Sequence, residues 1–170
     1  MNLKLFKRYS IIVGIIFANI FIDQFAKYIV RTNIRESELI PIMGKFLILT
    51  RIENSGAFLS LGDSLPPFIK TILLSVLPCL VILAGLSFIF IKTNLSGLLV
   101  TALCFILGGG IANLYDRIVL GSVTDFFHMD FVIFQTGIFN LADVSIMIGM
   151  ATILFDSYLN TGRETIGPIT

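Results

Sequence analysis

Four apolar runs constrain the fold of this chain more than any other feature. They lie at about residues 10–30, 67–91, 98–115 and 138–159. Each has the roughly 17 to 25 residues that a helix needs to cross a bilayer. The chain is also 56% hydrophobic and only 14% charged, far from the average soluble composition. The sequence therefore predicts an all-α integral membrane protein, a single domain over residues 1–170 with four transmembrane helices.

The first apolar run resembles a cleavable signal peptide at its start, because Lys4, Lys7 and Arg8 precede it. No site of the small-x-small type follows the run, however, and it continues through Asp23 and Lys27. We therefore expect this run to be a helix of the mature protein.

The connections between the four runs are unequal in length. A short link at residues 92–96 forces the second and third helices to be antiparallel, whereas the connections at about residues 31–66 and 116–137 each exceed twenty residues. Four crossings place both long connections on one side of the membrane, and the short link and both termini on the other. Arg31 and Arg35 after the first helix nearly balance the basic residues before it, so charge leaves the orientation open.

The long connections contain segments suited to the membrane surface. Residues 45–52 alternate and are rich in β-formers, which predicts a short extramembrane β element. Residues 57–61 fit a short turn of interfacial helix, and Pro66-Pro67 marks re-entry into the membrane. Phe126-Phe127 and residues 131–134 place the second connection at the interface as well.

Several function classes are excluded by what the sequence lacks. The net charge is +1 with no basic run longer than Lys7-Arg8, so nucleic-acid binding is not expected. Cys79 and Cys104 lie inside apolar runs without a His or carboxylate nearby in sequence, which predicts packing and not a disulfide, a metal site or a nucleophile. The motifs HExxH and GxSxG are absent. We expect neither a metal nor a cofactor.

Polar residues gather near one face of the predicted membrane domain. They come from the end of the first run, the first long connection, the end of the third run and the start of the fourth: Asp23, Lys27, Asn54, Asn113, Asp116, Arg117, Asn140 and Asp143. Asp143 is expected about 7 Å inside its helix at 1.5 Å per residue. One pocket below the interface would collect these side chains, with Asp125 brought over it by a loop.

Structural roles account for several of these residues. Asp23 and Lys27, spaced i, i+4, fit a pair that neutralises itself. Asp116 beside Arg117 fits an ion pair that anchors the end of a helix.

Other polar and small residues also have a structural interpretation. Gly108 and Ala112 form a small-xxx-small pair that favours close helix packing. Asn140 is suited to capping the fourth helix while holding a neighbouring side chain. His128 and Asp130 are expected to be ordinary loop residues.

Asp125 and Asp143 fit a structural role less well. Neither has a cation within one helical turn, and Asp143 lies in an apolar helix. Two facing carboxylates share one proton, so one pKa rises and the pair supplies an acid and a base at the same pH. Such a pair can activate a water molecule and polarise a scissile carbonyl, as in aspartic proteases.

Five motifs together resemble the bacterial lipoprotein signal peptidase family, also called signal peptidase II. They are Asp23-Gln24-Phe25-Ala26-Lys27, Asn54-Ser55-Gly56-Ala57-Phe58, Asn113-Leu114-Tyr115-Asp116-Arg117, Gly121-Ser122-Val123-Thr124-Asp125-Phe126 and Phe139-Asn140-Leu141-Ala142-Asp143. The resemblance covers essentially the whole chain, and all five occur in order. One departure is the order of small residues in Gly108-Gly109-Gly110-Ile111-Ala112-Asn113, where the family usually has Gly-Gly-Ala-x-Gly-Asn.

The resemblance implies an aspartyl protease of the bacterial inner membrane. Such an enzyme removes the signal peptide from diacylglyceryl-modified prolipoproteins, cutting just before the lipidated cysteine, and globomycin inhibits it. Both termini would be cytoplasmic, the site would lie near the outer face in contact with membrane lipid, and the protein would be a monomer. Asp125 and Asp143 match the catalytic pair. The positions that match support or substrate positioning are Asp23, Lys27, Asn54, Gly56, Asn113, Asp116, Arg117 and Asn140.

Two other functions remain open on the residues alone. A small ion- or proton-coupled transporter would also use intramembrane acids. However, the polar residues cluster at one face, and the second helix offers little beyond Lys70 at its entrance. A membrane adaptor without catalysis would leave the pairing of Asp125 with Asp143 unexplained.

Overall fold

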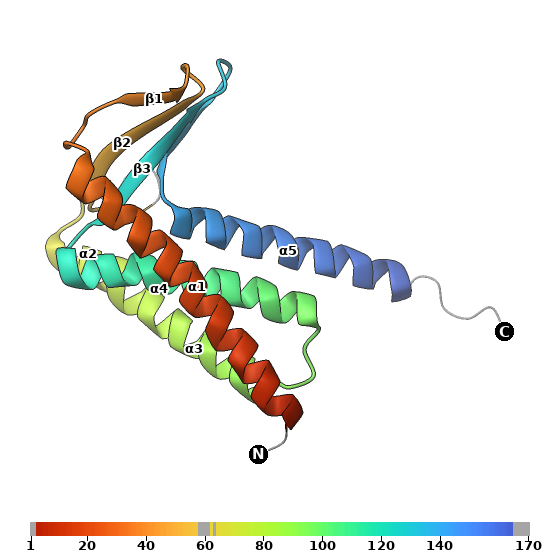
Figure 1. The fold of residues 1–170 in the computed structure, drawn as a ribbon. Coiled ribbons are helices and arrows are strands. Elements are labelled where there is room, and N and C mark those ends of the chain that lie inside the picture. The colour runs from red at the N-terminus through yellow and green to blue at the C-terminus, as the bar shows by residue number, and fades with distance from the viewer. Residues whose placement is uncertain (1–2, 58–61, 63, 165–170) are drawn as a thin grey trace.

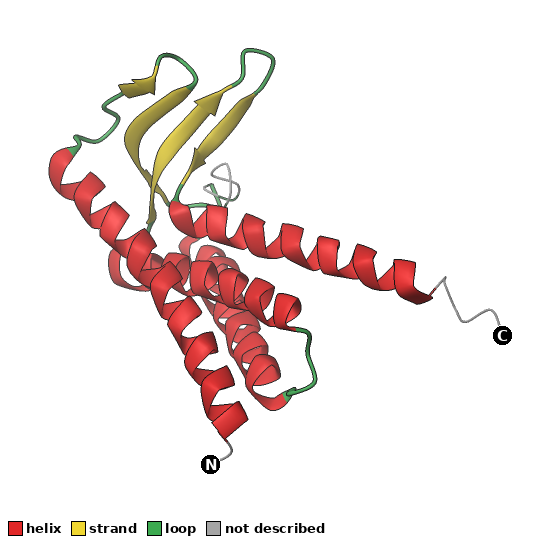
Figure 2. Cartoon of the chain, turned by 45° about the vertical axis from the view of Figure 1, so that its right-hand side comes forward, coloured by secondary structure: helices red, strands yellow, loops and turns green. Residues whose placement is uncertain are grey.

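The computed structural model describes residues 3–57, 62 and 64–164. Long helices form one part of the molecule, and a small sheet stands at one end of them (Figure 1; Figure 2). The helical elements are α1 (Leu3–Asn33), α2 (Pro67–Thr71), η2 (Ile72–Val76), α3 (Leu77–Ile91), α4 (Gly97–Leu120) and α5 (Leu141–Glu164). The short π-helical segment η2 joins α2 to α3 within one continuous span.

The prediction of four membrane helices is confirmed, because four described helical segments are long and apolar enough to cross a bilayer. Two of these helices are longer than the apolar runs suggested. The first helix extends back to Leu3, and the third continues to Leu120, where Gly121 adopts a left-handed conformation with φ of 80° and ends it. Asp116 and Arg117 therefore lie within α4 and not in the connection that follows.

The sheet is antiparallel, with the strands in sequence order. Its strands are β1 (Ile40–Met43), β2 (Leu47–Asn54), β3 (Val123–Asp130) and β4 (Gln135–Phe139). The predicted extramembrane β element is confirmed by β2. The interfacial helix expected at residues 57–61 lies, apart from Ala57, outside the described residues.

The second long connection is also β structure, which was not predicted from its sequence. It forms β3 and β4, and β3 pairs with β2 so that Ile52 lies opposite Asp125. His128 and Asp130, expected in a loop, lie in β3. Phe126, expected at the interface, is 1% exposed and packs with Val30 of α1. Pairing with the distant strand β2 overrides the local pattern here.

Small residues bring α4 close to both α1 and α5. A Cβ atom at Gly108 would lie 2.7 Å from Cβ of Asn19 in α1, and one at Gly109 would meet the carbonyl oxygen of Ala142 in α5. Ala112 is completely buried. The predicted packing role of this small-residue segment is confirmed.

The two ends of the molecule differ in character. The sheet lies at one end, while the start of α1, the link from α3 to α4 and the last turns of α5 lie away from it (Figure 1). Apolar side chains along the helices, such as Phe17, Leu80 and Leu154, are exposed. This pattern fits helices that face lipid.

Candidate active site

An ionic cluster joins α1 to α4 beneath the sheet. Lys27 is completely buried, and its Nζ lies 2.7 Å from Asp23 and 2.8 Å from Asp116. Nη2 of Arg31 lies 3.0 Å from Oδ1 of Asp116, which also accepts a hydrogen bond from Nε2 of Gln24 at 3.0 Å. Two carboxylates thus face two cations, which lets these charges be buried together.

The ion pair expected between Asp116 and Arg117 is not what the structure has. Consecutive residues of a helix point in different directions, so their side chains do not face each other. Asp116 turns toward α1, whereas Nη2 of Arg117 donates to the carbonyl of Gly56 at 3.1 Å. The Arg117 charge also acts on Asp125 and Asp143.

The start of α5 is fixed by reciprocal hydrogen bonds. The backbone N–H of Asp143 donates to Oδ1 of Asn140 at 2.9 Å, and that of Asn140 donates to Oδ2 of Asp143 at 3.1 Å. This is a capping box, so the predicted capping role of Asn140 is confirmed. Asp23 accepts from the backbone N–H of Ala142 at 2.8 Å, which ties α1 to the same turn.

Asp143 lies nearer the helix end than we expected. The fourth helix begins at Leu141 and not at residue 138, because β4 continues to Phe139. Asp143 is therefore in the first turn of α5, not about 7 Å within it.

Side-chain amides connect the two candidate catalytic aspartates. Nδ2 of Asn140 donates to Oδ1 of Asp125 at 2.6 Å, while Nδ2 of Asn54 donates to Oδ2 of Asp125 at 2.9 Å. Nδ2 of Asn113 donates to Oδ1 of Asp143 at 2.9 Å. Asn140 thus contacts both aspartates, one through its side chain and the other through its capping box.

Asn113 links the aspartates to the ionic cluster. Its Oδ1 accepts from Nζ of Lys27 at 2.9 Å and from Nδ2 of Asn140 at 3.1 Å. Because the oxygen faces two donors, its Nδ2 is left to face Asp143. The buried charge of Lys27 therefore fixes the orientation of an amide at the candidate site.

Asp125 extends from strand β3, whereas the sequence predicted that a loop would carry it. It is 4% exposed. Burial, together with the charge of Asp143, raises the pKa of Asp125 to about 6. The hydrogen bonds from Asn54 and Asn140 and the charge of Lys27 act in the opposite direction. A carboxyl group with this pKa can hold or release a proton near neutral pH.

The loop after β2 closes one side of the site. The backbone N–H of Gly56 donates to Oδ1 of Asn54 at 2.9 Å, and the Gly56 carbonyl accepts from Arg117. A cavity of about 320 Å³ opens beside this loop between α2, η2 and α4. Its lining residues are Ser55, Pro67, Lys70, Thr71, Leu74, Ser75, Arg117 and Gly121.

Hydrogen bonds and ion pairs connect every predicted site residue into one network. The members are Asp23, Lys27, Asn54, Gly56, Asn113, Asp116, Arg117, Asp125, Asn140 and Asp143. Among the described residues there is no cluster of His, Cys, Asp and Glu suited to a metal ion. The side chains of this network can transfer protons and can donate or accept hydrogen bonds.

Comparison with known proteins identifies the family. The family model described as Signal peptidase (SPase) II matches residues 15–159. This chain belongs to the signal peptidase II family. Together with the four spanning helices, that membership makes it a multi-pass bacterial membrane protein of a peptidase family.

This signal peptidase II family member is similar to its relatives along most of their length. A lipoprotein signal peptidase from Moorella thermoacetica is 35% identical over 144 residues, which cover 84% of this chain and 89% of the relative. One from Brevibacillus brevis is 34% identical over 152 residues, covering 89% and 95%. A solved structure described as a bacterial membrane enzyme, determined by the in meso method, has a TM-score of 0.80 at 25% identity and covers 95% of both chains.

Sequence reasoning missed some residues that support the site of this signal peptidase II family member. Gln24 and Arg31 contact Asp116, and Nε of Arg31 donates to Oγ1 of Thr124 at 2.7 Å. Thr124 in turn contacts Glu53 of β2. The i, i+4, i+8 spacing of Asp23, Lys27 and Arg31 was the signal for Arg31, whereas nothing local pointed to Glu53.

Proposed function

We propose that this protein removes the signal peptide from diacylglyceryl-modified prolipoproteins, cutting before the lipidated cysteine. The relatives are named lipoprotein signal peptidases, which supports the substrate class. In this proposal Asp125 and Asp143 activate a water molecule, so the enzyme is an aspartic endopeptidase. It needs neither a metal nor a cofactor.

The observation that carries the proposal is the position of Asn140 between the two aspartates. Its amide holds Asp125, and its backbone and side-chain oxygen hold Asp143. A residue with these bonds fixes the two carboxyl groups relative to each other before substrate arrives. Preorganised groups of this kind need no rearrangement during the reaction.

The proposed reaction uses one proton shared by the pair. The ionised carboxylate takes a proton from water as the water oxygen attacks the scissile carbonyl carbon, and the protonated carboxyl group donates to the carbonyl oxygen. The tetrahedral intermediate then collapses. The carbon–nitrogen bond breaks as the pair gives a proton to the amine of the lipidated cysteine, and one hydroxyl of the intermediate returns its proton to the pair as the carbonyl re-forms. With a pKa of about 6, Asp125 is suited to be the proton donor.

The remaining residues are proposed to support this pair. Lys27 and Asn113 orient the amides around Asp143, and Asp23 and Asp116 neutralise the buried cation. Arg117 and Gly56, with Asn54, hold the loop beside the cavity. We propose that the substrate enters there as an extended peptide, with its acyl chains in membrane lipid.

The sidedness of the protein is part of the same proposal. The substrate is a secreted precursor, so the site and the sheet would lie at the outer face of the inner membrane and both termini in the cytoplasm. The working unit is proposed to be a monomer, and globomycin is proposed to inhibit it. The transporter alternative finds no support in the family match, and the site network lies at one end of the helices.

A cleavage assay tests the substrate class directly. Purified protein in detergent or lipid is incubated with a precursor carrying diacylglycerol on its cysteine and with the same precursor unmodified. We expect release of the signal peptide from the modified precursor only. Equal cleavage of both would refute the proposed specificity, and cleavage of neither would refute the proposed activity.

A further inference from the structure

The turn between β3 and β4 exposes apolar side chains outside the site network. Val132 is 95% exposed, Ile133 89% and Phe134 56%. No charged residue lies between Asp130 and Gln135. An exposed tip made only of large apolar residues marks a surface that meets something other than water.

Three backbone N–H groups of this turn have hydrogen-bond partners close by, those of Phe131, Val132 and Ile133. The N–H of Phe131 donates to the Phe134 carbonyl at 2.9 Å, and that of Ile133 to the Phe131 carbonyl at 2.8 Å. The N–H of Val132 donates to Oδ1 of Asp130 at 2.8 Å, and that of Asp130 to the Phe46 carbonyl at 3.0 Å. Turns in water often pair in this way, and backbone that enters hydrocarbon needs such pairing. The bonds of this turn are therefore compatible with insertion into lipid.

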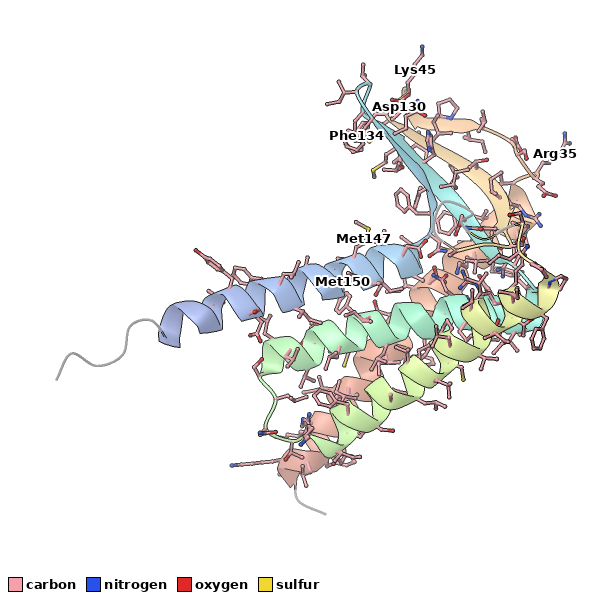
Figure 3. All side chains as sticks on the ribbon, turned by 180° about the vertical axis from the view of Figure 1, so that it is seen from behind. Arg35, Lys45, Asp130, Phe134, Met147 and Met150 are labelled. Atoms are coloured by element: carbon pink, nitrogen blue, oxygen red, sulfur yellow. The ribbon has the colours of Figure 1, made fainter. Side chains whose placement is uncertain are left out.

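Aromatic rings make the base of the tip rigid. The ring of Phe131 lies 5.0 Å from that of Phe46 in an edge-to-face arrangement and 4.5 Å from that of Phe134 in a stack, measured between centroids. Lys45 extends from the neighbouring turn, where a long cationic side chain can reach the headgroup region. Figure 3 shows Lys45 at the far end of the sheet, so a cationic side chain lies beside the apolar wedge formed by the tip.

The position of the sheet brings this wedge to the lipid-facing side of α5. The sheet stands over the start of α5 (Figure 1). In Figure 3, Phe134 lies on the same side of the molecule as Met147 and Met150, and Arg35 lies on the opposite side. Met147 and Met150 are 66% and 55% exposed on a membrane-spanning helix. The wedge therefore lies on the same side of the molecule as this exposed part of α5.

We propose that the β3–β4 turn, residues 131–134, inserts into the acyl region of the bilayer beside the start of α5. Lipid is favoured over a second copy of the chain because Met147 and Met150, on the same side of the molecule, are exposed on a helix long and apolar enough to span the membrane. The turn then anchors the sheet at its far end, while Asn140 and the site lie at the other end. This inference depends on the membrane-spanning helices and not on the proposed catalytic activity.

Tryptophan fluorescence tests the insertion, because the chain contains no Trp. An Ile133→Trp variant of the full chain is reconstituted into phosphatidylcholine bilayers, some of which carry bromine on the acyl chains near the headgroup. Glu36→Trp, at an exposed position in the connection from α1 to β1, is the matched control. We expect bromine to quench the emission of the Ile133→Trp variant at least about threefold more strongly than that of the Glu36→Trp variant, as for an interfacial depth.

Two outcomes would overturn the proposal. Equal, weak quenching of both variants by bromine together with equal quenching by aqueous iodide would place the tip in water. A second copy of the chain would cover the tip if neither quencher reduced the emission of the Ile133→Trp variant, and if quenching by bromine appeared only after the protein was diluted with excess lipid. Either result leaves the cleavage assay unaffected, so the two proposals fail separately.

Discussion

Side-chain amides give the candidate site its order. Asn54, Asn113 and Asn140 each use their amide groups on fixed partners, so the two aspartates are held by groups that do not titrate. Lys27 holds Asn113 and also acts on Asp125 through its charge, and Asp116 forms an ion pair with Lys27. The charge of Lys27 is balanced by Asp23 and Asp116, so the carboxyl group of Asp125 stays free to exchange a proton.

The environment of Asp125 predicts a pH-dependent difference in stability. Its pKa rises from a usual 3.8 to about 6, so the folded protein binds this proton more tightly than the unfolded chain. The stabilisation is present below about pH 4 and is lost as pH rises through 6, a change of about 3 kcal/mol. The melting temperature of the wild type relative to Asp125→Asn should fall over this range, measured by thermal unfolding in detergent. A difference that does not vary with pH would contradict this assignment.

Helix packing sets the position of the first turn of α5. Gly109 in α4 lies directly against the Ala142 carbonyl, so a methyl group there must push α5 away and shift Asn140 and Asp143 with it. We expect Gly109→Ala to lose about 1 to 3 kcal/mol of stability and at least about tenfold in cleavage rate. Melting temperature and the precursor assay measure the two effects.

Gly14→Ala is the matched control for that substitution. A Cβ atom at Gly14 of α1 would meet nothing within 4 Å. Alanine there should keep full activity and leave stability equal or slightly higher, since Ala favours helix by about 1 kcal/mol. Equal losses in both variants would show that helix composition, and not the contact between α4 and α5, decides the result.

The sequence predicted those features that depend on local pattern or on polarity. Apolar runs of sufficient length indicated the four helices, and costly polar residues such as Asp143 indicated the site. The strands β3 and β4 were missed because β3 is held by its pairing with β2, about 70 residues earlier in the chain, and no local pattern around residues 123–139 reveals that pairing. The predicted partner of Asp116, Arg117, was wrong for the same reason. The contact between α1 and α4 brings Lys27 to Asp116, and no local pattern reveals that contact.

The whole molecule separates its polar chemistry from its membrane-spanning surface. The sheet and the site share one end of the helices, and the link from α3 to α4 lies at the other (Figure 1; Figure 2). If the sheet faces outward, a reagent that does not cross membranes should reach the sheet end in intact cells but not the link from α3 to α4. The charge distribution along the sequence leaves this orientation open.

Cysteine labelling measures that orientation. In a background with Cys79 and Cys104 replaced by Ala, a single Cys is placed at Glu36 near the sheet or at Asn94 in the link from α3 to α4. We expect an impermeant maleimide to label Glu36→Cys in intact cells and Asn94→Cys only after lysis. The reverse pattern would place the site in the cytoplasm and contradict the proposed route of the substrate.

The most direct test of the account is the activity of the two aspartates. We predict that Asp125→Asn and Asp143→Asn each reduce cleavage of the diacylglyceryl-modified precursor by at least about a thousandfold, because neither leaves an ionisable pair. Asp130→Asn, the same change near the far end of β3, should cleave at the wild-type rate. If either site variant folds and retains normal cleavage, the proposed aspartate mechanism is wrong.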